Sequence, residues 1–307
     1  MSSTPAETTA QPALSLLRSA RRIGFAFSGG SVRCAFQVGV IESLLELGIH
    51  PALTLGVSGG AWNAMAIAAG TEARLRHYWR AFSRMPPLDF RNLLREHSPY
   101  RFSEMHQRTF SRYVGAERLH RPEALPAWVG VTRLRDRKPF YFDARESEDP
   151  LNLGLASNYV PPFYTHAPRI DGERCGDGGL SENLPYRKAF EEGCDAVVLV
   201  TMKGESEGLP YRNGHDPLHE IPSPYAERTV MIRPRHRLPC AWTERHWPVL
   251  TQIIEMGRLR AREVILGETH PECEQRGRMN PIGEMLSRFV LIRVMAAATP
   301  RQPTPGP

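Results

Sequence analysis

Lysine is scarce in this chain: only three of its 39 basic residues are lysines, and the others are arginines. Either codon usage or the attraction of arginine to anionic surfaces such as phospholipid headgroups would produce this bias. The formal net charge is +6, yet the arginines are scattered along the sequence rather than gathered in one run. Because nucleic-acid-binding proteins concentrate their basic residues, the sequence predicts no nucleic-acid partner.

Cysteines are few and widely spaced. The chain has five, and no two of them form a CxxC pair. An odd number without such spacing argues against a disulfide framework and against a zinc site. Free thiols in a reducing compartment are therefore expected. The sequence indicates a cytoplasmic protein, either free or peripheral at a membrane surface.

Long apolar runs are also missing. No window of about 18 residues is apolar and uncharged, so we predict no transmembrane helix. The N-terminus lacks a basic segment followed by an apolar core, so we predict no signal peptide. With 307 residues, 41% hydrophobic and 23% charged, the composition is typical of a globular protein with one large or two modest domains.

Alternating apolar segments predict an α/β fold with a mainly parallel sheet. The stretch IGFAFSGG (23–30) predicts a strand that runs into a glycine loop, and residues 31–49 have the apolar spacing of a helix. A second strand and helix flank residues 56–60. Further strands are expected at 125–134, 138–144, 196–202 and 229–235, and an amphipathic helix at 249–266.

The boundaries of the folded domain are expected near residues 23 and 266. Residues 1–22 are rich in small and polar residues and predict a flexible N-terminal arm. Residues 267–307 form a C-terminal extension, in which 282–298 predicts a packed helix rather than an interfacial one. Residues 71–125 mix arginines with aromatic residues and prolines. They predict either a lid or wall of a substrate cleft, or ordinary packing helices.

The most informative motif is GVSGG at residues 56–60, which fits G-x-S-x-G. This pattern places a nucleophilic serine, here Ser58, on a tight turn between a strand and a helix. Side chains at Gly56 and Gly60 would collide with the neighbouring strand or helix. Chance alone gives such a match in about one chain in ten. The apolar strand before the motif and the small-residue helix after it make the functional interpretation stronger.

A serine nucleophile needs a base. The best candidate is Asp177, which lies between Gly176 and Gly178 in CGDGG, although Asp-Gly is also a common turn pair. A Ser–His–Asp hydrolase would instead place a histidine after the acid. Five late histidines satisfy that order, and none lies in a glycine-framed loop: His215, His219, His236, His246 and His270.

Acyl transfer also needs hydrogen-bond donors for the oxyanion. The segment SGGSVR (28–33) supplies a Gly-Gly loop that opens a helix, so its N–H groups would face an anion. It matches neither G-x-G-x-x-G nor the P-loop pattern, which argues against a nucleotide site.

Three segments in this order resemble the patatin-like phospholipases, and in particular their bacterial branch. They are the glycine loop with its helix, the GVSGG elbow, and GDGGLSENLPYRKAFEEGCDAVVLV from residue 176; LASNYVPPFY (155–164) resembles the family's Ala-Ser…Pro stretch. The resemblance spans about residues 23–266. It implies a three-layer α/β/α fold and hydrolysis of lipid acyl esters, commonly phospholipids, by a Ser–Asp dyad without a cofactor or metal.

The resemblance also assigns roles to individual residues. Ser58 matches the nucleophile and Asp177 the dyad carboxylate. The supporting and loop positions then follow: Gly29, Gly30 and Ser31 match the oxyanion loop, Arg33 the basic residue after it, Gly56 and Gly60 the elbow, Gly178 and Gly179 the turn after the aspartate, and Asn183 and Pro185 two structural positions.

Two positions depart from the family pattern. Ser31 replaces the third loop glycine, and Cys34 replaces the glycine after the basic residue; Gly59 stands where alanine is common. A serine keeps its N–H, so the loop is expected to survive if position 31 does not need a positive φ. These departures keep a catalytically weak lipid-binding protein as one alternative. An ordinary Ser–His–Asp esterase is the other.

Overall fold

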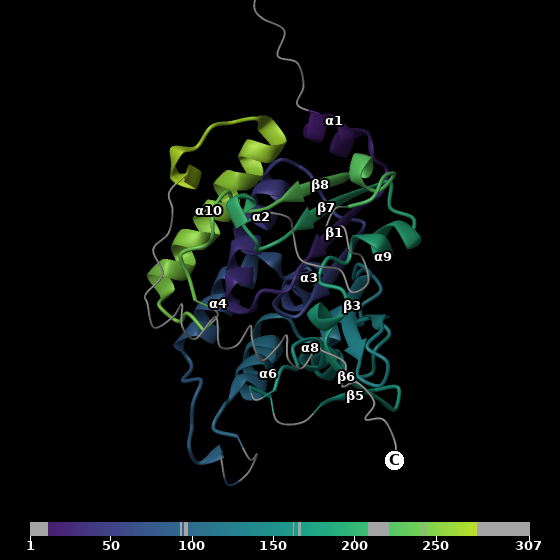
Figure 1. The fold of residues 1–307 in the computed structure, drawn as a ribbon. Helices are drawn as coiled ribbons and strands as arrows, with labels where there is room; N and C mark the ends of the chain where they lie inside the picture. The colour runs from purple at the N-terminus through teal and green to yellow at the C-terminus, as the bar shows by residue number, and fades with distance from the viewer. Residues whose placement is uncertain are drawn as a thin grey trace, which may run out of the picture.

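A computed structural model describes residues 12–92, 94, 98–161, 163–164, 167–207, 221–241 and 243–274. The chain folds around one eight-stranded sheet (Figure 1). Its strands are β1 (Ile23–Phe27), β2 (Leu53–Val57), β3 (Ala127–Arg133), β4 (Pro139–Asp143), β5 (Arg169–Ile170), β6 (Glu173–Asp177), β7 (Ala196–Val200) and β8 (Thr229–Ile232). Their order is β5-β6-β3-β2-β1-β7-β8, with β4 paired to β3.

Helices connect and cover the strands. They are α1 (Pro12–Ser19), α2 (Ala35–Glu46), α3 (Gly59–Ala68), α4 (Leu75–Arg84), α6 (Phe102–Tyr113), α7 (Ala116–Leu119), α8 (Pro150–Ser157), α9 (Tyr186–Glu191) and α10 (Trp247–Leu266). A short 3-10 turn, η1 (Ser31–Cys34), precedes α2, and another, η3 (Gly178–Leu180), follows β6.

The centre of the sheet is parallel. β1 pairs in parallel with β2 and β7, β2 with β3, and β7 with β8. Every residue of β1, β2 and β7 is buried, as expected for parallel strands covered on both faces. The predicted α/β fold with a mainly parallel sheet is confirmed. The expected strand pair at 125–134 and 138–144 is also present, as the antiparallel pair β3 and β4.

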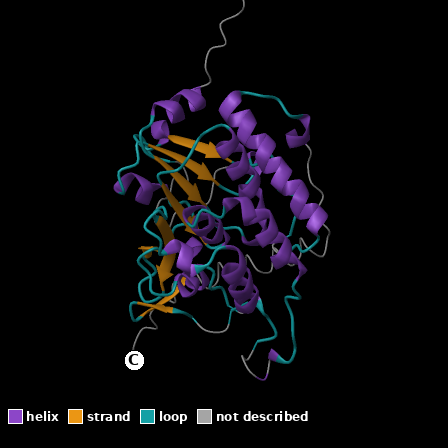
Figure 2. Cartoon of the chain, turned by 180° about the vertical axis from the view of Figure 1, so that it is seen from behind, coloured by secondary structure: helices purple, strands orange, loops and turns teal. Residues whose placement is uncertain are grey.

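Helices lie on both faces of the sheet, most of them on one face (Figure 2). Alternate residues of β1 point to opposite sides: Phe25 and Phe27 belong to the large core that also contains residues of α2, α3 and α10. Ala26 belongs to a smaller core that contains Tyr186 of α9. The result is three layers, with the helical layer of α9 much the thinner.

The segment expected to be a flexible arm differs in part from that expectation. Residues 12–19 form α1, and its Leu17 is buried in the large core. Residues 1–11, the predicted helix at 282–298 and the C-terminal tail lie outside the described residues. Among the helices that the structure describes, none has the length and apolar character needed to cross a membrane.

Candidate active site

Ser58 occupies the one-residue turn between β2 and α3. Its backbone has φ 53° and ψ −129°, a conformation that L-residues rarely adopt. The flanking glycines make this turn possible. A Cβ at Gly56 would lie 2.4 Å from the Gly60 carbonyl oxygen, and one at Gly60 would lie 2.7 Å from that of Phe27. The strained turn therefore presents the serine hydroxyl at the end of the strand.

Two residues at the end of α8 hold the backbone of Ser58, and neither is among the site residues predicted from the sequence. The Ser58 N–H donates to the Ser157 hydroxyl over 2.8 Å, and that hydroxyl donates to the Gly130 carbonyl over 2.6 Å. The Asn158 side-chain amide donates to the Ser58 carbonyl over 2.9 Å. Their only signal in the sequence was the LASNYVPPFY stretch.

Asp177 meets Ser58 because β2 and β6 approach each other head-on along the same edge of β3. The last residue of β2, Val57, pairs with Gly130, and the last residue of β6, Asp177, pairs with the next residue, Val131. β2 runs parallel to β3 and β6 antiparallel, so both strands end at this point. A Cβ at Gly178 would lie 2.3 Å from the Gly130 carbonyl oxygen, so the chain after Asp177 also needs glycine.

The Asp177 carboxylate is buried, with 7% of the residue exposed. Burial raises its pKa from the ordinary value to about 6, while hydrogen bonds from Ser58 and from the Gly179 N–H oppose the rise. The Gly179 bond measures 2.8 Å. A carboxylate with a pKa near 6 is ionised at neutral pH and is a stronger base than an exposed one.

The N–H groups of the glycine loop do not all face the pocket. Gly29 donates its N–H to the Asn183 side-chain oxygen over 2.8 Å, so this group is committed to the protein. Ser31 lines the pocket together with Val32 and Gly59. The N–H of Gly59, at the start of α3, has no intrahelical partner because of its position. Gly59 was not among the predicted oxyanion donors.

Position 31 does require a positive φ. Ser31 has φ 55°, so the condition under which serine would replace glycine without strain is not met. Arg33 helps to hold this conformation, since its Nε donates to the Gly30 carbonyl over 3.2 Å. The loop therefore keeps a positive φ at position 31, although serine is strained in that conformation.

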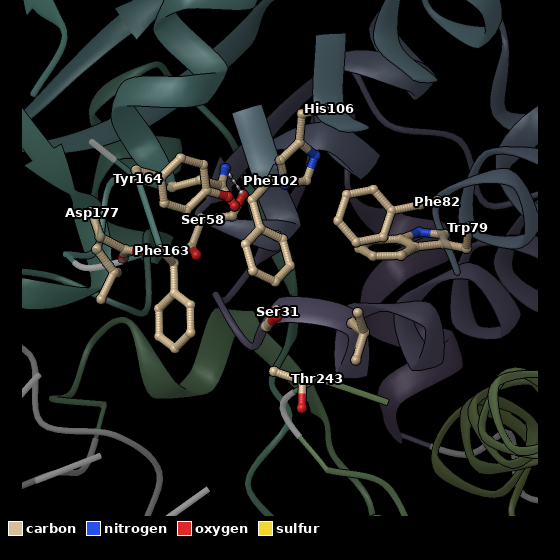
Figure 3. Close-up of a pocket in the computed structure, with 14 residues that line it drawn as sticks. Ser31, Ser58, Trp79, Phe82, Phe102, His106, Phe163, Tyr164, Asp177 and Thr243 are labelled. Carbon is tan, nitrogen blue, oxygen red and sulfur yellow. Dashed lines mark hydrogen bonds between the residues drawn. The ribbon is translucent and has the colours of Figure 1, made fainter. Parts of the chain in front are cut away.

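Ser58 and Asp177 open into an aromatic-walled pocket (Figure 3). Residues of α4, of α6 and of the chain after α8 form the wall: Trp79, Phe82, Phe102, His106, Phe163 and Tyr164. The segment 71–125 therefore supplies one wall of the cleft, which was one of its two predicted roles.

His106 is the histidine of this pocket. It is buried, its Nδ1 is 3.1 Å from the Tyr78 hydroxyl, and desolvation lowers its pKa to about 3. The late histidines behave differently: His236, His246 and His270 do not line the pocket, and His215 and His219 lie outside the described residues. In the part of the chain that the structure describes, no group of three or more His, Cys, Asp or Glu is placed to hold a metal ion.

Three comparisons show what this chain is similar to. The model of the family described as patatin-like phospholipase matches residues 25–190. An uncharacterised Escherichia coli (strain K12) protein, YjjU, is 26% identical over 188 residues, which cover 58% of this chain and 51% of that protein. The chain thus spans about half the length of this curated relative. The crystal structure of VipD from Legionella pneumophila aligns with a TM-score of 0.48 and 12% identity, covering 90% of this chain and 74% of that one.

Proposed function

Because the chain belongs to the patatin-like phospholipase family, we propose that it is a lipid acyl hydrolase that cleaves carboxylic esters, phospholipids among them, through a Ser58–Asp177 dyad. The observation that carries this proposal is the head-on meeting of β2 and β6 on β3. It places a serine on a strained turn against a buried carboxylate, and both face an apolar pocket. An ester with a long acyl chain suits such a pocket better than a polar substrate.

In the proposed first step, the Ser58 Oγ attacks the ester carbonyl carbon while its proton passes to Asp177. The bond to the leaving alcohol then breaks, and Asp177 returns the proton to that oxygen. In the second step, water attacks the acyl-enzyme with Asp177 again as base, which releases the fatty acid and restores Ser58. A carboxylate with a pKa near 6 is suited to both proton transfers at neutral pH.

The negative charge that develops on the carbonyl oxygen needs donors beside Ser58. We assign this role to the N–H groups of Gly59, Gly30 and Ser31, at the starts of α3 and η1. The two starts lie close together, since a Cβ at Gly59 would be 2.8 Å from the Ser31 carbonyl oxygen. Gly29 supports the loop through Asn183 rather than binding the oxyanion itself.

A catalytically weak lipid-binding protein is the second candidate. The positive φ of Ser31 favours it, because this strain acts on one of the proposed donors. Binding to vesicles without hydrolysis of any ester would select this candidate over the enzyme.

The test is a panel of phospholipids, lysophospholipids, triacylglycerol and p-nitrophenyl esters offered to the purified protein. We expect Ser58→Ala and Asp177→Asn to abolish hydrolysis in a folded protein, and a serine-directed phosphonate to label Ser58 in the wild type. Ser43→Ala is the matched control, because the Ser43 hydroxyl is buried in α2 without a hydrogen-bond partner in the described structure. If Ser58→Ala retains near wild-type turnover, the mechanism is wrong.

A further inference from the structure

Exposed apolar side chains gather in one place on this protein. Among the described residues, four large hydrophobic side chains are exposed, and three of them lie within seven positions between α4 and α6. These are Leu88, Phe90 and Leu94, at 44%, 75% and 89% exposure. We call these three residues the apolar tip. Soluble monomers rarely expose apolar groups in a cluster unless the cluster meets a partner or a membrane.

The apolar tip stands on a defined neck. Leu88 and Tyr100 form an antiparallel bridge. The Asp89 N–H donates to the Pro99 carbonyl over 2.8 Å, and the Arg101 N–H donates to that of Pro87 over 2.9 Å. In both ribbon views the chain between α4 and α6 extends away from the sheet and its helices (Figures 1 and 2). The tip is therefore held outward by backbone bonds at its base.

The segment of the chain that carries the apolar tip is basic. Residues 71–125 contain eleven arginines and six acidic residues, a net charge of +5, out of +6 for the whole chain. Arg84, before the apolar tip, and Arg91, between Phe90 and Leu94, are exposed. An apolar projection on a basic segment complements an anionic phospholipid surface, where the headgroups attract the charge and the acyl region accepts the apolar groups.

A row of aromatic rings joins the neck to the pocket. The ring of Tyr100, on the neck, lies 4.8 Å from that of Phe163 and 6.1 Å from that of Phe102, measured between centroids. Phe102 and Phe163 both line the pocket that contains Ser58. A membrane that accepts the tip would therefore lie next to the apolar wall along which a lipid chain must enter.

We propose that Leu88, Phe90 and Leu94 insert into the surface of an anionic phospholipid membrane and hold the pocket wall against it. This inference rests on the proposed function in one respect, that the pocket takes a lipid ester. It assigns membrane contact to three residues outside the pocket and away from Ser58 and Asp177.

The test uses the full chain carrying Ser58→Ala, so that no lipid is consumed during binding. Sedimentation with vesicles of phosphatidylglycerol and phosphatidylcholine, or of phosphatidylcholine alone, is measured in about 0.1 M and 1 M salt, where charge attraction is strong and largely screened. We expect Phe90→Ser and Leu94→Ser each to weaken binding to the anionic vesicles by about tenfold. Higher salt should weaken binding more in these variants than in the Ser58→Ala protein, because a larger share of their binding depends on charge attraction.

The matched control is Leu134→Ser, which changes the fourth exposed large hydrophobic residue, at the turn between β3 and β4. It should bind vesicles as tightly as the parent, which is the protein that carries Ser58→Ala alone. Wild-type affinity in Phe90→Ser and Leu94→Ser would overturn the proposal, and so would a parent that does not bind vesicles. If the parent is instead a dimer that these variants convert to a monomer, the tip contacts a second copy and the proposal is also wrong.

The same variants with Ser58 intact separate this inference from the proposed function. Phe90→Ser should hydrolyse a water-soluble p-nitrophenyl ester as the wild type does, but should lose most of its activity on vesicle phospholipid. If the wild type hydrolyses no ester while vesicle binding still depends on the tip, the proposed function fails and the membrane contact stands.

Discussion

A side chain at position 59 would need the space that the Cys34 sulfur already occupies. A Cβ added at Gly59 would lie 2.9 Å from the Cys34 Sγ and 2.8 Å from the Ser31 carbonyl oxygen. The family pattern has glycine at position 34 and commonly alanine at position 59. In this chain the larger residue is at position 34 and the glycine is at position 59. The two departures compensate each other beside the nucleophile.

We therefore predict a coupling between these positions. Gly59→Ala alone should destabilise the protein by about 1–3 kcal/mol through overpacking. In a Cys34→Ala background, Gly59→Ala should destabilise the protein by a smaller amount, although the contact with the Ser31 carbonyl remains. Urea unfolding of the four proteins measures the coupling free energy. Cys194→Ala, at a buried cysteine in the other core, is the control background, and an equal cost in both backgrounds would refute the coupling.

Ser31→Gly should stabilise the protein by up to about 1 kcal/mol, because it relieves the positive φ of position 31. We also expect ester hydrolysis to be preserved or raised, since the N–H group stays in place. The control is Asp171→Gly at another positive φ, 49°, in the turn between β5 and β6. It should raise the melting temperature without changing the rate. A Ser31→Gly protein less stable than wild type would contradict this account of the loop.

Asn183→Ala should damage both stability and activity. It leaves the buried Gly29 N–H without its acceptor, at a cost of about 1–3 kcal/mol, and frees the glycine loop beside Ser58. We expect kcat for a p-nitrophenyl ester to fall even at an assay temperature where the variant remains folded. Asn152→Ala, which removes an exposed bond to the Arg169 carbonyl, should leave kcat unchanged.

Hydrolysis should increase with pH as Asp177 loses its proton, with a midpoint near its raised pKa of about 6. A midpoint in this range is usual for histidine, but burial lowers the pKa of His106 to about 3. The pH–rate profile of His106→Gln should therefore keep the same midpoint. Loss of the midpoint in that variant would transfer the basic role from Asp177 to His106.

The stability effect of Asp177→Asn should itself depend on pH. The folded state holds the Asp177 proton more tightly than the unfolded chain does. The bound proton therefore adds its full contribution to stability below the ordinary carboxylate pKa, and this contribution is lost as the pH rises through about 6. At pH 8 the ionised carboxylate costs about 3 kcal/mol, and the uncharged amide of the variant avoids this cost. Melting temperatures of both proteins are measured at pH 4.5 and pH 8. Relative to the wild type, the variant should be more stable at pH 8 than at pH 4.5.

Asp136→Asn should show no such change between pH 4.5 and pH 8. The ion pair with Arg133 lowers the pKa of Asp136, so the stability that this carboxylate adds is lost only as the pH falls below the ordinary carboxylate pKa. A variant-to-wild-type difference for Asp177→Asn that is constant with pH would show that the pKa of this carboxylate is not raised in the folded state.

Local patterns in the sequence were enough to predict the parallel strands and the turn at Ser58, and they left the role of 71–125 open between a cleft wall and packing helices. Strand alternation and a glycine-framed serine depend on residues adjacent in the chain, so their physics is local. The same local signals predicted too much flexibility for residues 12–19. The burial of Leu17 there depends on packing into the large core, which no local pattern reports.

Only the tertiary structure decided which groups meet. Ser58 and Asp177 are 119 positions apart, and they come together because β2 and β6 end at adjacent residues of β3. The commitment of Gly29 to Asn183 and the support of Ser58 by Ser157 arise in the same way. The positive φ of Ser31 likewise follows from how its loop packs. Sequence determined the elements and their chemistry, and long-range register and burial determined their geometry and the pKa of Asp177.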